Sequence, residues 1–292
     1  MYVTLKKTVP VSAWYMLASA LGFALMAACV KIANTTYSIP VLEIVAARAI
    51  VSAVISYADV RRKNISVWGN NKPLLMARGT VGALALIFVY YAITTLPLAE
   101  ATILQYLHPV FTAILALVFL KEIIQRSTIS CIVLSLLGLF IMIQPNLLND
   151  NSTPYSWLSI GAAILGAFGS AVAYVIVKQL TKTEDSSVIV FYFPIIAIPI
   201  SITLLGSDFV VPSLAATGVL VLVGIFTQVG QIGLTKALHS ADANKATAYA
   251  YVQVLFSVLI GWAYFSEVPV LTTLMGGACI LAGALINVFW KR

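Results

Sequence analysis

Two series of polar side chains stand inside strongly apolar stretches, and they are the groups of this chain best suited to bind a polar solute. The first series is Thr102, Gln105, His108 and Thr112, and the second is Tyr249, Gln253 and Ser257. At about 100° per residue, each series lies on one face of a helix. Hydroxyl, amide and imidazole groups are costly at membrane depth unless they find partners or line a wet cavity. Both series therefore predict a solute-binding cavity; the alternative is hydrogen bonding between packed helices.

The two series belong to a repeat of about half the chain. Residues 92–122 recur without a gap as residues 237–267, so that Glu122 corresponds to Glu267 at an offset of 145 residues (267 less 122). By this offset His108 and Gln253 are counterparts. In a membrane protein, a doubled half-chain indicates a transporter whose site lies where the repeats meet. We therefore expect the two series to line facing walls of a central cavity.

Aromatic and amide side chains on other apolar stretches are expected to complete this substrate site. They are Tyr106, Gln228, Gln231, Tyr90, Tyr174 and Trp14. Aromatic rings beside amides suit a moderately polar organic substrate. For tyrosines near the ends of spans, the alternative is an interfacial aromatic belt. That alternative is weakest for Tyr106, which lies well inside its stretch.

Charged side chains within the apolar stretches are the candidates for coupling or gating. Glu43 and Arg48 lie five positions apart in one stretch, on different faces of a straight helix, and Lys31 is the nearest candidate partner of Glu43. An intramembrane charge is a functional hypothesis with a partner to be named. The alternatives are a structural Glu43–Lys31 ion pair, and for Arg48 either binding of an anionic group or anchoring of helix ends, with the structural role preferred. Glu43 and His108 are the plausible proton carriers.

The elements that must position these residues are membrane-spanning helices. Hydrophobic residues make up 61% of the chain and charged residues only 9%, against roughly 25% charged residues in a soluble domain. With about 20 apolar residues per span, we expect about ten spans in an all-α integral membrane protein. Continuous apolar runs argue against a barrel of alternating strands. The predicted spans are residues 12–33, 40–58, 73–95, 99–120, 127–144, 156–178, 187–206, 213–236, 242–264 and 268–290.

Lysine and arginine side chains lie in the loops of one side, with Lys31 as a marginal exception. They are Lys6, Lys7, Arg61, Arg62, Lys63, Lys72, Lys121, Arg126, Lys178, Lys182, Lys236, Lys245, Lys291 and Arg292, with Arg78 just inside the third span. This positive-inside pattern predicts that both termini are cytoplasmic in the inner (plasma) membrane. Each repeat then has an odd number of spans, so the second copy is inverted. We expect a first five-helix repeat over 1–146 and a second over 147–292, together forming one membrane domain.

Composition and motifs exclude several classes of function. The sequence contains no HExxH, GxSxG or P-loop motif, so we expect no enzyme, no catalytic residue and no ATP-driven step. The three cysteines stand alone in apolar runs and offer no metal or disulfide spacing; no metal and no cofactor are expected. A pI near 9.3 indicates nucleic-acid binding in a soluble protein, but here the basic residues set topology. The expected partners are the lipid bilayer and a small-molecule solute.

Proline and glycine mark two further local features. Pro109 removes one helical hydrogen bond and predicts a kink near Gln105; the alternative is a proline that the membrane helix tolerates. Gly276 and Gly277 permit close approach of another helix. They could equally form a contact surface for a second subunit, which makes a homodimer possible.

The fourth span carries a recognisable pattern. Ala101 is followed by Pro109 after seven residues and by Glu122 after a further twelve, at the end of LVFLKE. Together with Arg48 in the second span and two five-helix halves, this pattern resembles the EamA-type branch of the drug/metabolite transporter superfamily. The second half departs from the pattern because it has Val254 where proline is usual.

The resemblance covers nearly the whole chain and implies a ten-helix secondary transporter with an inverted repeat. Members of that family move amino acids, nucleotide-sugar-like solutes, cofactors, S-adenosylmethionine and other metabolites, by export, uptake or exchange. The expected function is alternating-access transport of a small polar or zwitterionic, amino-acid-like metabolite. One alternative is uptake or exchange of S-adenosylmethionine or a similar cofactor. A second is a non-transporting membrane scaffold or receptor, which needs no polar cavity.

Overall fold

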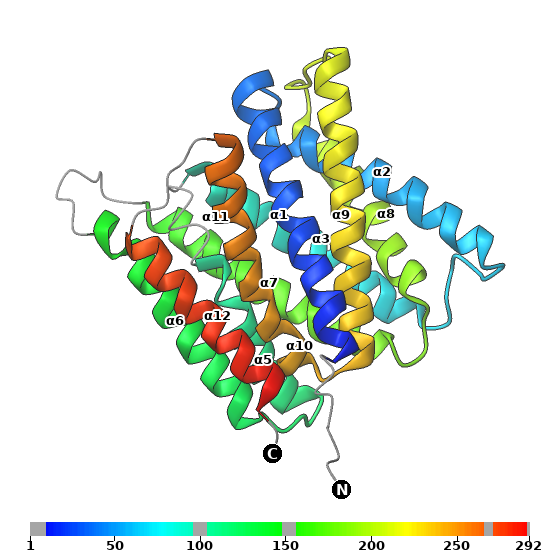
Figure 1. The fold of residues 1–292 in the computed structure, drawn as a ribbon. Helices are drawn as coiled ribbons and strands as arrows, with labels where there is room; N and C mark the ends of the chain where they lie inside the picture. The colour runs from blue at the N-terminus through cyan, green and yellow to red at the C-terminus, as the bar shows by residue number, and fades with distance from the viewer. Residues whose placement is uncertain (1–9, 96–103, 148–155, 266–270, 291–292) are drawn as a thin grey trace, which may run out of the picture.

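The computed structural model describes residues 10–95, 104–147, 156–265 and 271–290, and every regular element in these ranges is helical (Figure 1). The elements are α1 (Val11–Tyr37), α2 (Val41–Arg62), α3 (Lys72–Thr95), α5 (His108–Phe119), α6 (Arg126–Leu147), α7 (Trp157–Leu180), α8 (Ser186–Leu205), α9 (Leu214–Ser240), α10 (Ala243–Ala248), the 3-10 turn η1 (Tyr249–Tyr251), α11 (Val252–Phe265) and α12 (Leu271–Phe289). The all-α fold class is confirmed for the described residues.

Length and apolar character identify membrane-crossing helices among the described residues. Seven helical stretches are long and apolar enough to cross a membrane, and three shorter apolar helices, His108–Phe119, Arg126–Ile141 and Leu274–Phe289, accompany them. The predicted spans and the observed helices agree in order and, where both ends are described, to within a few residues. The count of ten spans stays a prediction, because only seven stretches of the described residues meet the criterion of length and apolar character.

Local sequence explains where several helices begin and end. Pro10 and Pro40 stand immediately before α1 and α2, where proline's fixed backbone angle suits the start of a helix. Ser156 and Ser213 cap α7 and α9 by accepting hydrogen bonds from backbone N–H groups of the first turn. Ser38 adopts the left-handed conformation, with φ of 53°, and ends α1.

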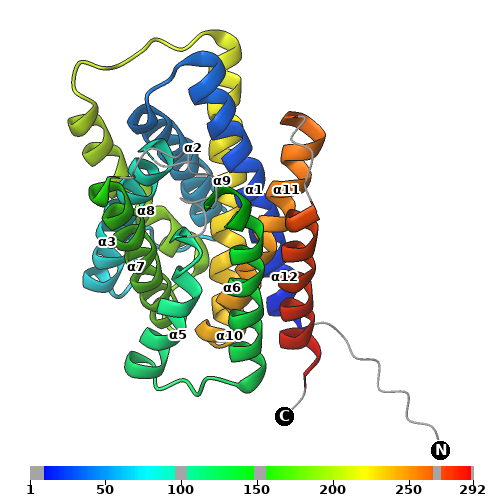
Figure 2. The same cartoon turned by 90° about the vertical axis from the view of Figure 1, so that its left-hand side faces the viewer.

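The helices pair across the two halves of the chain. α1 packs along α9, α3 along α7, α2 along α8 and α6 along α12, and both views show α1 beside α9 (Figures 1 and 2). The offset of the sequence repeat relates α1 to α7, α2 to α8, α3 to α9 and α6 to α12. If each helix is replaced by its counterpart, the α1–α9 pair becomes the α7–α3 pair, which is also observed. The α2–α8 and α6–α12 pairs each consist of two counterparts, so they stay unchanged. This pattern of packing is what a two-fold relation between the halves requires.

Glycines let the paired helices approach closely. A methyl group added at Gly138 on α6 would run into the carbonyl oxygen of Gly276 on α12, and one at Gly22 on α1 would lie 2.8 Å from the backbone nitrogen of Gly230 on α9. Gly276 and Gly277 are both buried within the chain. The suggestion that these two glycines face a second subunit is therefore wrong, because α6 and the neighbouring helices of the same chain already cover them. A homodimer stays an untested prediction.

Candidate functional site

The fourth and ninth apolar stretches are each interrupted in their first half. In the fourth, a turn at residues 106–107 separates a short helical segment from α5, whose second residue is Pro109. In the ninth, η1 separates α10 from α11. By the repeat offset, η1 corresponds to residues 104–106, so the two interruptions overlap at the counterparts Tyr106 and Tyr251. Discontinuous helices free backbone polar groups at mid-membrane depth and mark the binding sites of transporters built from inverted repeats.

Tyrosines at the two interruptions contact each other. The rings of Tyr106 and Tyr251, which are counterparts by the repeat offset, stack with centroids 5.8 Å apart, and both side chains are buried. Arg48 and Phe193 are a second pair of counterparts (193 less 48 is 145), and the guanidinium carbon lies 5.5 Å from the ring centroid. A residue that contacts its own counterpart must lie close to any two-fold axis that relates the halves. Both contacts therefore belong to the centre of the molecule.

Polar atoms without partners gather beside the tyrosine stack. The His108 ring packs edge-on against Tyr174, with centroids 5.2 Å apart. Gln105 donates a long hydrogen bond of 3.5 Å to Ser170. His108 Nδ1, Gln105 Oε1 and the Tyr251 hydroxyl are buried and have no hydrogen-bond partner among the described residues. Buried polar groups are usually satisfied, so these three atoms together suit a region that accepts a polar solute.

Two arginines lie next to this region. Arg48 and Arg78 are each 3% exposed, and both guanidinium groups lie against the ring of Phe193. Arg48 donates to the Tyr90 hydroxyl at 2.9 Å, and Arg78 donates to the Gln231 side-chain oxygen at 3.3 Å. Sequence reasoning missed Arg78, because its position near the end of a span resembled a topology signal. The signal that could have found it is Gly82, one helical turn later, which leaves room for the guanidinium group.

Other predicted site residues make contacts of their own. Gln228 bridges Ser52 and Ser56 of α2 at 2.5 and 2.6 Å. The Tyr249 hydroxyl donates to the Asn287 carbonyl of α12 at 3.3 Å. Gln253 is half-buried. These contacts tie α9 to α2 and η1 to α12, so Gln228 and Tyr249 have partners within the protein.

The expectation that Tyr249, Gln253 and Ser257 share one face assumed a continuous helix. Because η1 interrupts that helix, the 100° spacing does not hold across it. Ser257 is exposed, as is Trp14, at 61%. Thr102 lies outside the described residues. The facing of His108 and Gln253 across a cavity stays a prediction.

The charged candidates also have defined surroundings. Glu43 is buried and accepts a hydrogen bond of 3.0 Å from the backbone N–H of Val210, in the connection between α8 and α9. Lys31 lies over the ring of Phe265, with its Nζ atom 4.4 Å from the centroid. Glu43 thus joins α2 to a connection in the second half of the chain.

At the end of the molecule that carries Lys63, Lys121 and Lys178, here called the basic end, carboxylates also bind across the halves. Lys121 adopts a left-handed conformation, with φ of 56°, and ends the turn after α5. The next residue, Glu122, accepts hydrogen bonds from the backbone N–H groups of Ala243 and Asn244 and from the Asn244 side chain, at 3.0 to 3.3 Å. The beginning of α10 is therefore fastened to the end of α5.

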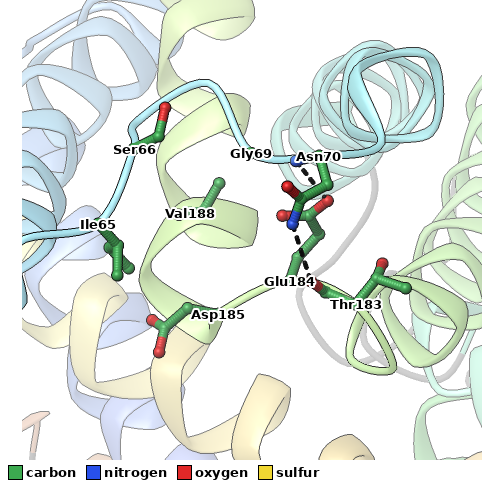
Figure 3. A pocket seen from close by; sticks show the side chains of 8 residues that line it. All are labelled: Ile65, Ser66, Gly69, Asn70, Thr183, Glu184, Asp185 and Val188. Carbon is green, nitrogen blue, oxygen red and sulfur yellow. Dashed lines mark hydrogen bonds between the residues drawn. The ribbon is translucent and has the colours of Figure 1, made fainter.

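A second contact closes the basic end between the α2–α3 and α7–α8 connections. Glu184 accepts hydrogen bonds of 2.7 and 2.6 Å from the backbone N–H groups of Asn70 and Asn71, and Figure 3 shows it reaching that connection beside a pocket of about 310 Å³. Lys63 binds Asp185 at 2.8 Å. Burial acts to raise the pKa of Asp185, but hydrogen bonds from Lys63 and Ser187 outweigh it and hold that pKa below its usual range. The contact is therefore charged at neutral pH.

Comparisons with known proteins agree with this architecture. Residues 11–144 and 157–289 each match the EamA-like transporter family. The pseudopaline exporter CntI of Pseudomonas aeruginosa (strain UCBPP-PA14) is 33% identical over 266 residues, 90% of each chain. The S-adenosylmethionine uptake transporter of Rickettsia felis is 26% identical over 204 residues, 69% of this chain and 67% of the relative.

A solved crystal structure shows the same fold. It superposes with a TM-score of 0.75, at 17% sequence identity, and covers 92% of this chain and 96% of its own. Likeness at this identity concerns the fold alone. The two family matches together span nearly all of the described residues, and the chain belongs to the EamA-like transporter family.

Proposed function

We propose that this protein is a secondary transporter that moves a small polar or zwitterionic, amino-acid-like metabolite across the inner membrane by alternating access. The observation that carries the proposal is the pair of helix interruptions, which overlap at Tyr106 and Tyr251 and are joined by the stacking of these two rings. Repeats over 1–146 and 147–292, inverted in the membrane, account for the exchange pattern of helix packing. One repeat would rock against the other around the interrupted helices.

Export is the preferred direction, because the relative that matches over 90% of both chains is named an exporter. Uptake or exchange of S-adenosylmethionine is the second candidate, supported by the uptake transporter that matches over 69% of this chain. A non-transporting scaffold would have no use for unpartnered polar atoms at its centre. The start of α1 and the end of α12 lie at the same end of the molecule (Figure 1), which supports two cytoplasmic termini.

Loss of single polar groups at the centre is expected to slow transport while the protein still folds and inserts. His108→Ala and Gln105→Ala each remove a group that could bind solute directly. A neutral hydrogen bond contributes about 0.5–1.5 kcal/mol, so each variant should weaken apparent affinity roughly two- to tenfold. Efflux from preloaded cells, analysed by mass spectrometry of the medium, measures this effect. Ser130→Ala, outside the central region, is the control. Efflux at the wild-type rate by both His108→Ala and Gln105→Ala would contradict the proposal that these side chains bind the solute.

Proton coupling is tested separately by removing the two candidate proton carriers. We expect Glu43→Gln or His108→Gln to flatten the pH dependence of transport into vesicles, because neither replacement can bind and release a proton. The measurement is the initial rate across a series of imposed pH gradients. Wild-type rates with an unchanged pH dependence in both variants would exclude proton coupling through these residues and would leave uniport or exchange.

A further inference from the structure

The two buried arginines have chemistry that the proposed function does not by itself require. Among the described residues, no carboxylate forms an ion pair with Arg48 or Arg78, whereas Arg62 and Lys63 pair with Asp59 and Asp185. Glu43, the acidic residue nearest to Arg48 in sequence, binds the backbone of Val210 instead. Both arginine residues are 3% exposed. A buried charge without an opposite charge is strongly unfavourable, so their retention calls for a ligand or a structural reason.

The hydrogen bonds of these arginines orient them but leave donors unused. A guanidinium group has five N–H donors and no acceptor. Arg48 donates to the Tyr90 hydroxyl and weakly to the Met26 sulfur at 3.6 Å, and Arg78 donates to Gln231. The Nε atoms of both arginines and Nη1 of Arg78 are buried without a partner. Neutral partners fix the direction of each group without cancelling its charge.

The guanidinium groups of Arg48 and Arg78 lie in the same region of the protein. Their guanidinium carbons lie 5.5 and 5.7 Å from the ring centroid of Phe193, and the two groups are close enough to interact electrostatically with each other and with Tyr174. Tyr174 in turn packs against His108. The arginines are thus continuous with the polar region at the helix interruptions. Helix-end anchoring does not explain two like charges drawn together at the centre.

We propose that the transported substrate is an organic anion and that its carboxylate groups bind Arg48 and Arg78. The proposal rests on the proposed transport function and names its substrate class. A carboxylate accepts two parallel N–H bonds from a guanidinium group and cancels its charge. The Phe193 ring, which both guanidinium groups approach, offers an apolar surface for the carbon skeleton. The same charges disfavour a cationic substrate such as S-adenosylmethionine, whose sulfonium group would be repelled in a region of low dielectric.

The test measures binding to the purified full-length protein with a matched pair of probes. Iminodiacetate carries two carboxylates on an amino-acid-like skeleton. Its dimethyl ester has the same skeleton and amine but lacks the two carboxylate charges. We expect iminodiacetate to raise the thermal-unfolding midpoint and the ester to have no effect. Arg48→Gln and Arg78→Gln, which keep a donor but lose the charge, should each weaken iminodiacetate binding at least tenfold. Arg62→Gln, at an exposed arginine of the basic end, should bind like the wild type.

Two more variants distinguish ligand binding by Arg48 and Arg78 from a purely structural role of these arginines. Arg48→Lys keeps the charge and should recover part of the binding that Arg48→Gln loses. Gly82→Ala keeps both arginines, but its methyl group would displace Arg78 Nη1 and should weaken binding. An equal response to the acid and the ester, no response to either, or wild-type binding by the glutamine variants would overturn the proposal, as would a stronger response to O-phosphoethanolamine than to iminodiacetate.

The outcome is separable from that of the proposed function. Carboxylate binding without transport in reconstituted vesicles would leave the anion site standing and would contradict the transporter. Transport of a neutral or cationic compound, with no iminodiacetate response, would establish the transporter and overturn the anion site.

Discussion

Replacing Glu122 with glutamine is expected to open the basic end of the protein. The Glu122 carboxylate accepts three hydrogen bonds from the beginning of α10 through its two oxygens. Glutamine keeps one oxygen and turns an N–H₂ group, itself a donor, toward an N–H donor. Hydrogen bonds to charged groups contribute about 1.5–3 kcal/mol each. The loss of one such bond would shift the balance toward a state open at the basic end by roughly ten- to a hundredfold.

Cysteine accessibility measures this shift. Ala246 on α10 is fully buried in the closed arrangement. In a background without Cys29, Cys131 and Cys279, Ala246→Cys should react slowly with a membrane-impermeant maleimide in inside-out vesicles, and Glu122→Gln should raise that rate at least tenfold. Lys121→Gln is the matched control, because it changes the neighbouring charge without touching the bonds to α10. Equal labelling in the presence and absence of Glu122→Gln would show that this carboxylate does not hold the end closed.

The contact of Glu122 with α10 bears on the alternating-access cycle that we propose. Glu122 fastens the end of the fourth apolar stretch to the start of the ninth, and these are the two stretches that carry the interruptions. In the alternating-access cycle that we propose, a solute released at the basic end would pass between them. The repeat offset assigns Glu267 as the counterpart of Glu122 at the opposite end. Glu267 lies outside the described residues, so a matching contact there is not part of the prediction.

The helices could be predicted from the sequence because the bilayer leaves the backbone little choice. Every polar backbone group in lipid must be satisfied within its own segment, so each apolar run of about 20 residues becomes a helix. The repeat offset also pairs Tyr106 with Tyr251, whose rings stack in the structure, whereas the pairing of His108 with Gln253 across a cavity stays a prediction. The interruption at η1 could not be predicted in this way. The second copy has Val254 where proline is usual, so the break has no proline signal, and it depends on packing.

Arg78 and Glu122 show a second limit of the sequence. An arginine near the end of a span can extend toward the interface or turn inward, and both have the same hydropathy signal. The difference lies in Gly82 and Gln231, which leave room for Arg78 and bind it. A glutamate that follows a span can cap or pair locally, yet the partners of Glu122 lie 121 and 122 positions away. Partners so distant in sequence become visible only when the fold brings them together.

The packing of α6 against α12 is expected to fail when Gly138 gains a side chain. In Gly138→Ala, the new methyl group would meet the Gly276 carbonyl oxygen, with Ile280 and Cys279 side-chain atoms at 3.0 and 3.2 Å. A backbone oxygen cannot move aside alone, so the two helices must separate along their length. Helix association in a membrane depends on close van der Waals packing. Overpacking of this kind costs about 1–3 kcal/mol, which should clearly lower the thermal-unfolding midpoint of the purified protein.

Gly161→Ala on α7 is the matched control, because nothing lies within 4 Å of its added methyl group. Alanine favours a helix over glycine by about 1 kcal/mol, so this variant should be at least as stable as the wild type. Gly283→Ala, the counterpart of Gly138, places its methyl group 3.0 Å from the Cys131 carbonyl oxygen. It should destabilise in the same direction but by less, because its contact is less severe. If Gly138→Ala and Gly161→Ala unfolded at the same temperature, α6 and α12 would not be packed as the structure has them.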